Sequence, residues 1–324
     1  MSINVVGSIN IDIVAMTNDY PLRGETKFGN KIDYLFGGKG ANQATAAAML
    51  GKEVNMIGSV GSDYYGDKLI ENLTSNKVNT RFVKKSDSFA TGTAIITIDR
   101  TAENTMLVLK SANEDLNVDD VESAFRELDD GGVLLVQMEV PQETVIRSMQ
   151  LAKEKGMYVI LDPAPAEGIT IKALEYADII TPNRQETKHM LDIDVIDVES
   201  ALRAARAFET MGVDQSIIKM ADKGSVVYQK GDWTYLESIP VDAVDTVGAG
   251  DSFAGALACS ILDGHDIEVA ARFASIVGAL KVTKVGAQSG LPTKAEVLEF
   301  CKERGLSYPQ PKESNFLKEA SQIE

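Results

Sequence analysis

A short glycine-rich segment near the C-terminus holds the residue best suited to chemistry. Residues 243–257 read AVDTVGAGDSFAGAL, in which Gly248, Ala249 and Gly250 precede an apolar helix that we expect to begin near Asp251. Small residues let backbone N–H groups approach a ligand, and the free N–H groups of a first helical turn bind anions. Asp251 beside a phosphoryl group could then accept a proton from an attacking hydroxyl. The alternative is that Asp251 only caps its helix, as Asp often does.

A second glycine-rich turn lies near the N-terminus, at residues 36–51, which read FGGKGANQATAAAMLG. Here the glycines lead into an alanine-rich helix that we expect to begin near Ala41 or Asn42. Such a turn can bring Lys39 and Asn42 into a cleft, because small residues leave room beside the backbone. The alternative is a purely structural turn.

The elements that must position these segments form a layered α/β pattern from about residue 132 onward. Apolar, β-branched runs alternate with amphipathic helices, which is typical of a parallel sheet covered on both faces. Residues 224–239 instead alternate around Gly231 and predict an antiparallel hairpin at a sheet edge. Three helices are expected after it, within residues 251–264, 268–284 and 293–305.

The N-terminal third predicts a small, mostly antiparallel sheet inserted into this body, with pieces from residues 12–36 and 90–108. A few projecting strands can cover a cleft as a lid, and an apolar face on them favours a homodimer. The alternative is an extension of the main sheet. We expect residues 1–308 to form one domain and residues 309–324 a polar tail outside the core.

Composition excludes several classes of partner. The chain has 324 residues and a formal net charge of −16, which disfavours non-specific binding to nucleic acid or to anionic membranes. No apolar run reaches the roughly 18 residues of a membrane span, and no signal peptide is evident. Cys259 and Cys301 are the only cysteines, so we do not expect a disulfide scaffold. We expect a cytoplasmic location instead.

Taken together, GGKGAN and DTVGAGD resemble the two signature regions of the ribokinase (PfkB-type) carbohydrate kinase family. The likeness runs from VVGSINID at residues 5–12 to GAQSGLP at residues 286–292, with QMEVP, DPAPA, ITPN and AVDT in between. It implies a three-layer α/β/α fold with a mostly parallel sheet and a small antiparallel β lid. It also implies phosphorylation of a small sugar by ATP, with D-ribose and its 5-hydroxyl as the first expectation and Asp251 as the base.

The resemblance also implies a sugar site built from residues of GSINID, GGKGAN and QMEVP. Besides Asp251, these residues are Asn10, Asp12, Gly38, Lys39, Asn42 and Glu139. Such a set leaves a poorly matched ligand with unpaired polar groups, which gives discrimination. It suits a neutral polyol, whereas an anionic sugar acid would favour Arg. Kinases for 2-deoxyribose, a keto-deoxy sugar acid, a hexose or a nucleoside remain alternatives.

For the nucleotide, the likeness implies a site whose anion hole is formed by residues 248–250. Asn183 and Glu186 would hold Mg²⁺ through water, since Mg²⁺ keeps much of its hydration. The ATP-binding residues it implies are Asn183, Lys219, Met220, Ala221, Asp222, Lys223, Gly224, Gly250 and Ser275.

A monovalent-cation site, and therefore activation by K⁺, is implied as well. The residues that match it are Asp245, Val247, Lys281, Lys284, Gly286 and Gly290. The sequence departs from the family pattern at four positions. Ala221 replaces a frequent Gly, Lys219 a frequent Thr, Ser275 an Asn or His, and Gly290 a frequent Ser.

Two other classes of function are weighed against a kinase. A sugar-binding protein that has lost catalysis would not need Asp251, Asn183, Glu186 and the small-residue turn, all of which are present. A nicotinamide-dependent oxidoreductase would need a dinucleotide fingerprint after the first strand, which is missing. His189 and His265 lie in no zinc-binding pattern.

Overall fold

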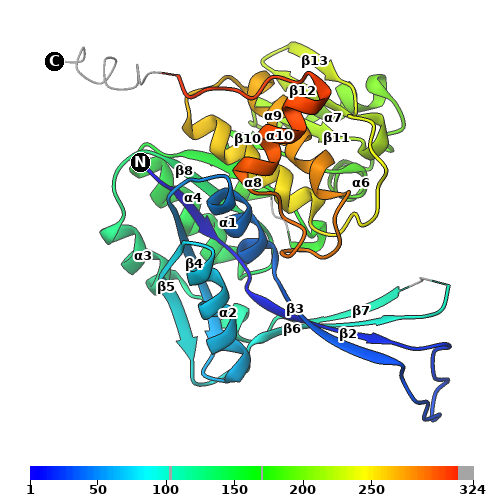
Figure 1. Cartoon of the computed structure of the whole chain (residues 1–324). Helices are drawn as coiled ribbons and strands as arrows, with labels where there is room; N and C mark the ends of the chain where they lie inside the picture. Colours follow the sequence, from blue (N-terminus) through cyan, green and yellow to red (C-terminus); the bar gives the residue numbers. More distant parts are fainter. Residues whose placement is uncertain (102–103, 169–170, 313–324) are drawn as a thin grey trace.

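The computed structural model describes residues 1–101, 104–168 and 171–312. Its body is built on a nine-stranded sheet (Figure 1). In spatial order the strands are β13 (Asp232–Leu236), β12 (Ser225–Gln229), β11 (Gln215–Lys219), β10 (Ile179–Ile180), β9 (Tyr158–Leu161), β8 (Val133–Val136), β1 (Ile3–Val6), β4 (Val54–Gly61) and β5 (Val78–Ser86). The strands from β11 to β5 pair in parallel, and β12 and β13 add the predicted antiparallel hairpin at one edge.

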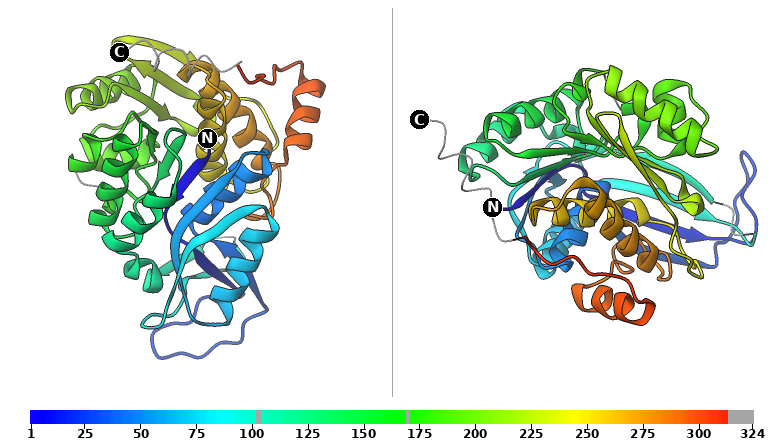
Figure 2. Two further views of the ribbon diagram at one scale, coloured as in Figure 1. Left: turned by 90° about the vertical axis from the view of Figure 1, so that its left-hand side faces the viewer. Right: turned by 90° about the horizontal axis from the view of Figure 1, so that it is seen from above.

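Helices cover both faces of this sheet (Figure 2). One layer consists of α1 (Lys39–Met49), α2 (Tyr64–Ser75), α8 (Ala249–Leu262), α9 (Ile267–Lys281) and α10 (Lys294–Arg304). The other consists of α3 (Val118–Glu127), α4 (Gln142–Glu154), α6 (Arg184–Leu191) and α7 (Val198–Thr210), with the one-turn α5 (Ile171–Leu174). Along β8, Val133 and Leu135 face the first layer and Leu134 and Val136 the second, as the twofold alternation of a strand requires. The predicted three-layer α/β/α fold is confirmed.

A second, four-stranded sheet projects from the body, and we call it the lid sheet (Figure 1). Its order is β3 (Lys31–Gly37), β2 (Asn10–Met16), β6 (Gly92–Ile98) and β7 (Asn104–Leu109). Both outer pairs are antiparallel, while the central pair β2 and β6 is parallel. Because these strands pair only with one another, the alternative of an extended main sheet is wrong.

Close packing of α1 on α8 links the two glycine-rich segments. A Cβ added at Gly255 would lie 2.8 Å from the Cβ of Ala46 and 2.9 Å from the carbonyl oxygen of Gln43. Only glycine permits this approach without a shift of the backbone. The start of α1 is thereby held against the start of α8.

The described beginning of the C-terminal tail is tied to the body. The imidazole Nε2 of His265 donates a hydrogen bond to the carbonyl oxygen of Gln310 at 2.8 Å. The backbone N–H of Lys312 donates to the carbonyl oxygen of Asp263 at 3.0 Å. Residues 313–324, the rest of the predicted tail, lie outside the described residues. None of the described helices is long and apolar enough to cross a membrane.

Candidate active site

Asp251 is the third residue of α8 and does not cap it. The helix begins two residues earlier than expected, and Gly248 takes the capping position with φ 77° and no side chain to accept from the first turn. The Asp251 carboxylate instead accepts hydrogen bonds from the amides of Asn42 at 2.8 Å and Gln43 at 3.1 Å. The capping alternative is therefore wrong, and the carboxylate is directed toward α1.

Gln43, which sequence reasoning missed, is the centre of a buried hydrogen-bond network. Its Nε2 donates to Asp162 at 2.8 Å as well as to Asp251, and its Oε1 accepts from Gln137 at 2.6 Å. The second oxygen of Asp162 accepts from Nζ of Lys219 at 3.2 Å. Asp162 and Gln137 open the motifs DPAPA and QMEVP, so their place after adjacent buried strands was the signal that could have identified them.

Lys39 supplies positive charge to this acidic cluster. Burial alone would lower the pKa of its ammonium, but Asp251, Glu139, Asp162 and Glu186 raise it, and the balance holds it above its usual range. Burial raises the pKa of Asp251, while the Lys39 charge and the hydrogen bond from Asn42 oppose the rise. Mutual compensation of buried charges is what makes such a cluster possible.

The predicted sugar residues converge on Asp251 from the lid sheet and the main sheet. Burial, followed by the charges of Glu139 and Asp251, raises the pKa of Asp12 to about 7. Glu139 accepts a hydrogen bond from the backbone N–H of Lys39 at 3.3 Å and another from the hydroxyl of Ser8. All six predicted sugar residues are thus brought to one end of the main sheet, together with Asp251.

Asn10 is oriented by a residue that the sequence did not single out. The Nδ2 of Asn113 donates to Oδ1 of Asn10 at 2.7 Å, and the Oδ1 of Asn113 accepts from the backbone N–H of Ile9 at 2.9 Å. Asn113 is 1% exposed, so its side chain forms hydrogen bonds to other residues of the protein and does not reach a ligand. It leaves the Nδ2 of Asn10 as the donor available to a ligand.

Gly38 is required by the turn into α1. It has φ 88°, and a Cβ there would lie 2.7 Å from the backbone N of Asn10 and 2.8 Å from the carbonyl oxygen of Ser8. The absence of a side chain lets the start of α1 touch the start of β2.

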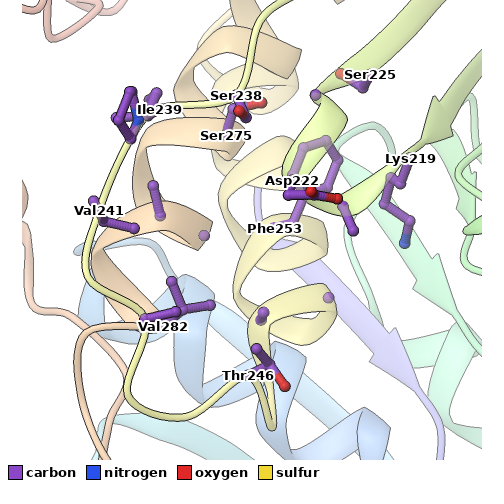
Figure 3. A pocket seen from close by; sticks show the side chains of 18 of the residues that line it. Lys219, Asp222, Ser225, Ser238, Ile239, Val241, Thr246, Phe253, Ser275 and Val282 are labelled. Atoms are coloured by element: carbon purple, nitrogen blue, oxygen red, sulfur yellow. The ribbon is translucent and has the colours of Figure 1, made fainter. Parts of the chain in front are cut away.

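On the other side of Asp251 lies a cavity of about 590 Å³ between α8, α9 and the segment after β13 (Figure 3). Its volume is in the range of small-molecule sites. Eight predicted residues line it: Asn183, Lys219, Ala221, Asp222, Gly224, Ala249, Gly250 and Ser275. Met220 and Lys223 do not, since Met220 is buried in the core and Lys223 donates to the carbonyl oxygen of Ile196.

The cavity has an apolar and a polar end. Ile239, Val241 and Val282 form one wall, opposite Lys219 and Asp222 (Figure 3). Sequence reasoning missed the apolar wall, because Ile239 and Val241 lie in a segment without regular structure and Val282 comes from the distant end of α9. Apolar side chains suit a planar base, and the start of α8 with Lys219 suits phosphates.

The backbone explains why Gly is frequent at the position of Ala221. Ala221 has φ 56°, in the left-handed region that favours glycine, and it opens the tight turn before Gly224. Alanine adopts the same turn with some strain, and the residue still lines the cavity.

Asn183 and Glu186 form a capping box at the start of α6. The Asn183 side chain accepts from the N–H of Glu186 at 2.9 Å, and the Glu186 carboxylate accepts from the Asn183 backbone N–H and side-chain amide, both at 2.7 Å. Burial raises the pKa of Glu186 to about 7, although Lys219 opposes the rise. Within the described residues no cluster of three metal-ligating side chains exists, so this pair fits a hydrated Mg²⁺ carried by phosphates better than a bare ion.

The residues predicted to bind potassium surround the side-chain ammonium of Lys281. The Asp245 carboxylate accepts hydrogen bonds from the backbone N–H groups of Val247 at 2.9 Å and Gly286 at 2.7 Å, which ties the two loops together. The Nζ of Lys281 donates to the carbonyl oxygens of Asp245 at 3.1 Å and Lys284 at 3.2 Å. An ammonium group therefore already uses two of the oxygens that a monovalent cation would need.

The layered fold and the paired glycine-rich helix starts place a cavity of small-molecule size next to a polar site, an arrangement that suits a phosphotransferase. The model of the pfkB family of carbohydrate kinases matches residues 2–294, and the chain belongs to this family. It is therefore an ATP-dependent sugar kinase.

Similar proteins span nearly the whole chain. Ribokinase of Haemophilus influenzae is 36% identical over 299 residues, covering 92% of this chain and 98% of that protein. Deoxyribokinase of Salmonella typhi is 34% identical over 303 residues, covering 93% and 98%. The structure of Arabidopsis thaliana ribokinase complexed with ribose and ATP has a TM-score of 0.85 and 30% identity, covering 93% and 98%.

The raised pKa of Asp12 predicts that its charge destabilises the ligand-free protein. Between about pH 4 and pH 7 the folded state holds a proton that the unfolded state has lost, so this carboxyl makes stability fall as pH rises. Asp12→Asn should therefore be more stable than the wild type at pH 8, by up to about 4 kcal/mol, and equal to it near pH 4. Urea unfolding at both pH values measures the difference.

Asp33→Asn is the matched control on the neighbouring strand, because Asp33 pairs with Lys31 at 2.8 Å. It should give no gain in stability at pH 8. Equal stabilities of Asp12→Asn and the wild type at pH 8 would contradict the assignment of a buried, destabilising charge.

Proposed function

We propose that this kinase phosphorylates D-ribose on its 5-hydroxyl, with ATP as the donor. The observation that carries the proposal is the position of Asp251. Ala249 and Gly250, just before it, line the nucleotide cavity, while its carboxylate faces Asn42 and the acidic and amide groups of the sugar site. A hydroxyl bound on one side of Asp251 would meet a phosphoryl group arriving from the other.

The polar set favours a neutral sugar with several hydroxyls. Asn10, Asp12, Asn42 and Glu139 offer carboxylate and amide groups, and Oδ1 of Asn42 is buried with no partner among the described residues. A sugar hydroxyl donating to this oxygen would remove the cost of leaving it unpaired. The ribokinase relatives support ribose, and the similarity to a deoxyribokinase makes 2-deoxyribose the second candidate.

In this proposal Asp251 acts as the base. Burial raises its pKa, which makes the carboxylate a stronger proton acceptor than one in water. Hydrogen bonds from Asn42 and Gln43 fix its orientation, and Lys39 compensates its charge. A positioned base of this kind contributes about 10²-fold to 10⁴-fold to rate.

The start of α8 is proposed to hold the transferring phosphoryl group. A Cβ at Gly250 would meet no atom within 4 Å, so the backbone there borders open space that an anion could fill. Lys219 lies at the same end of the cavity (Figure 3). Mg²⁺ held through water near Asn183 and Glu186 would neutralise phosphate charge, and K⁺ has no part in this scheme.

A coupled ADP-release assay with Mg-ATP tests the proposal against a panel of acceptors. The panel contains D-ribose, 2-deoxyribose, fructose, 2-keto-3-deoxygluconate and adenosine. We expect the highest kcat/KM on ribose and a product that is phosphorylated at the 5-position by NMR. A higher value on 2-deoxyribose or on any other acceptor would refute ribose as the substrate.

Asp251→Asn should lower kcat on the best acceptor by about 10²-fold to 10⁴-fold while leaving sugar affinity within a few-fold. Asp263→Asn is the control, because Asp263 follows the other end of α8 and pairs with Lys52. Calorimetric titration with the sugar separates binding from turnover. An Asp251→Asn enzyme with most of its activity would rule out the proposed base.

We further propose that the lid sheet mediates a homodimer. Tyr34, Ile95 and Leu107 are 51%, 40% and 59% exposed, and the strand registers place them in one row across the sheet with Ile13. Contiguous exposed apolar side chains favour a covered surface. A second copy of the chain would cover them.

The double variant Ile95→Glu/Leu107→Glu should shift the protein to a monomer, because it places charge on the proposed contact. Light scattering at assay concentration measures the mass. Leu298→Glu, on α10 and 41% exposed in the wild type, is the control and should stay dimeric. A monomeric wild type would disprove the dimer.

A further inference from the structure

Lys281 is the last residue of α9 and is completely buried, with 0% of its surface exposed. A buried ammonium is unfavourable unless polar groups surround it. Here the carbonyl oxygens of Asp245 and Lys284 accept its hydrogen bonds. These two residues belong to the loops that precede α8 and follow α9, so the Lys281 ammonium bridges them.

The surroundings of Lys281 are those of a cation site. The negative end of the α9 dipole lies at this residue. Burial lowers the pKa of the Lys281 ammonium, while the negative charges of Asp245 and Asp251 oppose that effect. Carbonyl oxygens and nearby negative charge would suit a bound K⁺ as well. The structure therefore contains a covalently attached cation where the family resemblance predicted a free one.

Gly290 provides the room for this side chain. A Cβ there would lie 3.2 Å from Cε of Lys281, 2.6 Å from the carbonyl oxygen of Gly286 and 3.1 Å from that of Val285. A serine, frequent at this position in the family, would crowd the lysine side chain. The departure at Gly290 and the side chain of Lys281 therefore fit one another sterically.

The bridged loops lead directly into the catalytic helix start. Asp245 holds Val247 and Gly286 through its carboxylate, and a Cβ at Gly248 would lie 3.1 Å from the carbonyl oxygen of Ala287. The loop around Gly286 thus supports the backbone of residues 247–249. A charge that fixes the loops also fixes the start of α8.

We infer that the Lys281 ammonium replaces the activating monovalent cation, so that this kinase works without K⁺. The activity measurement that tests this inference rests on the proposed function. The position of the Lys281 ammonium between the two loops does not depend on it. In this role Lys281 is a positioning residue, since it acts through the loops that hold the start of α8.

The first test compares ADP release in potassium chloride and in tetramethylammonium chloride at equal ionic strength, because tetramethylammonium is too bulky to enter the site. The wild type should differ by less than about twofold between the salts. Lys281→Ala should lose at least about tenfold in tetramethylammonium and regain activity as K⁺ is added. Lys281→Met, which fills the space without charge, should lose activity and not respond to K⁺.

The second test needs no substrate and so separates this inference from the choice of sugar. K⁺ should raise the melting temperature of ligand-free Lys281→Ala, because an ion that binds only the folded state stabilises it. The wild type and Arg272→Ala, which removes an exposed cation of the same helix, should show no such rise. If none of the sugars in the panel is phosphorylated, this measurement still shows whether the Lys281 ammonium occupies a K⁺ site.

Activation of the wild type several-fold by K⁺ over tetramethylammonium would overturn the inference. So would a Lys281→Ala protein whose activity and melting temperature match the wild type in both salts. If Lys281→Ala does not fold, K⁺-independence of the wild type together with inactivity of folded Lys281→Met still supports it.

Discussion

The side-chain amide of Gln43 is the interaction on which the site depends. One Nε2 group donates to both Asp162 and Asp251. The close packing of α1 on α8 at Gly255, where no side chain intervenes, holds Gln43 near Asp251. Asp162 also accepts a hydrogen bond from Lys219, which lines the proposed nucleotide cavity. Asp251 also accepts one from Asn42, which belongs to the proposed sugar site. Both halves of the site are therefore held by hydrogen bonds to the same buried side chain, Gln43.

Around this point the protein buries more negative than positive charge. Burial raises the pKa values of Asp12, Glu186 and Asp251, which means that their ionised forms are unfavourable in the free protein. A sugar brings hydroxyl donors and a nucleotide brings magnesium. The ligands therefore supply the hydrogen-bond donors and positive charge that these carboxylates lack in the empty site. Such a site is destabilising until it is filled, which is common where function requires converging charges.

Sequence patterns predicted the layers, the edge hairpin and the lid strands, because strand alternation and turn residues are local signals. They also located Asp251 and Asn42. They could not reveal Gln43 or Asn113, whose roles depend on contacts between residues 208 and 103 positions apart. For Lys281 the sequence could not reveal that its side-chain ammonium donates to the carbonyl oxygens of two loops, because those loops meet only in the folded chain.

Helix α8 carries Asp251, the proposed base, at the start of a continuous buried segment. Every residue from Asp251 to Ser260 is buried, between α1 and α9. Amide protons in such an element exchange with solvent only when the whole domain opens, unlike those of a projecting sheet. A destabilising substitution elsewhere should then lower the fraction of folded molecules without altering the geometry of those that remain. Activity per folded molecule would stay constant while total activity falls.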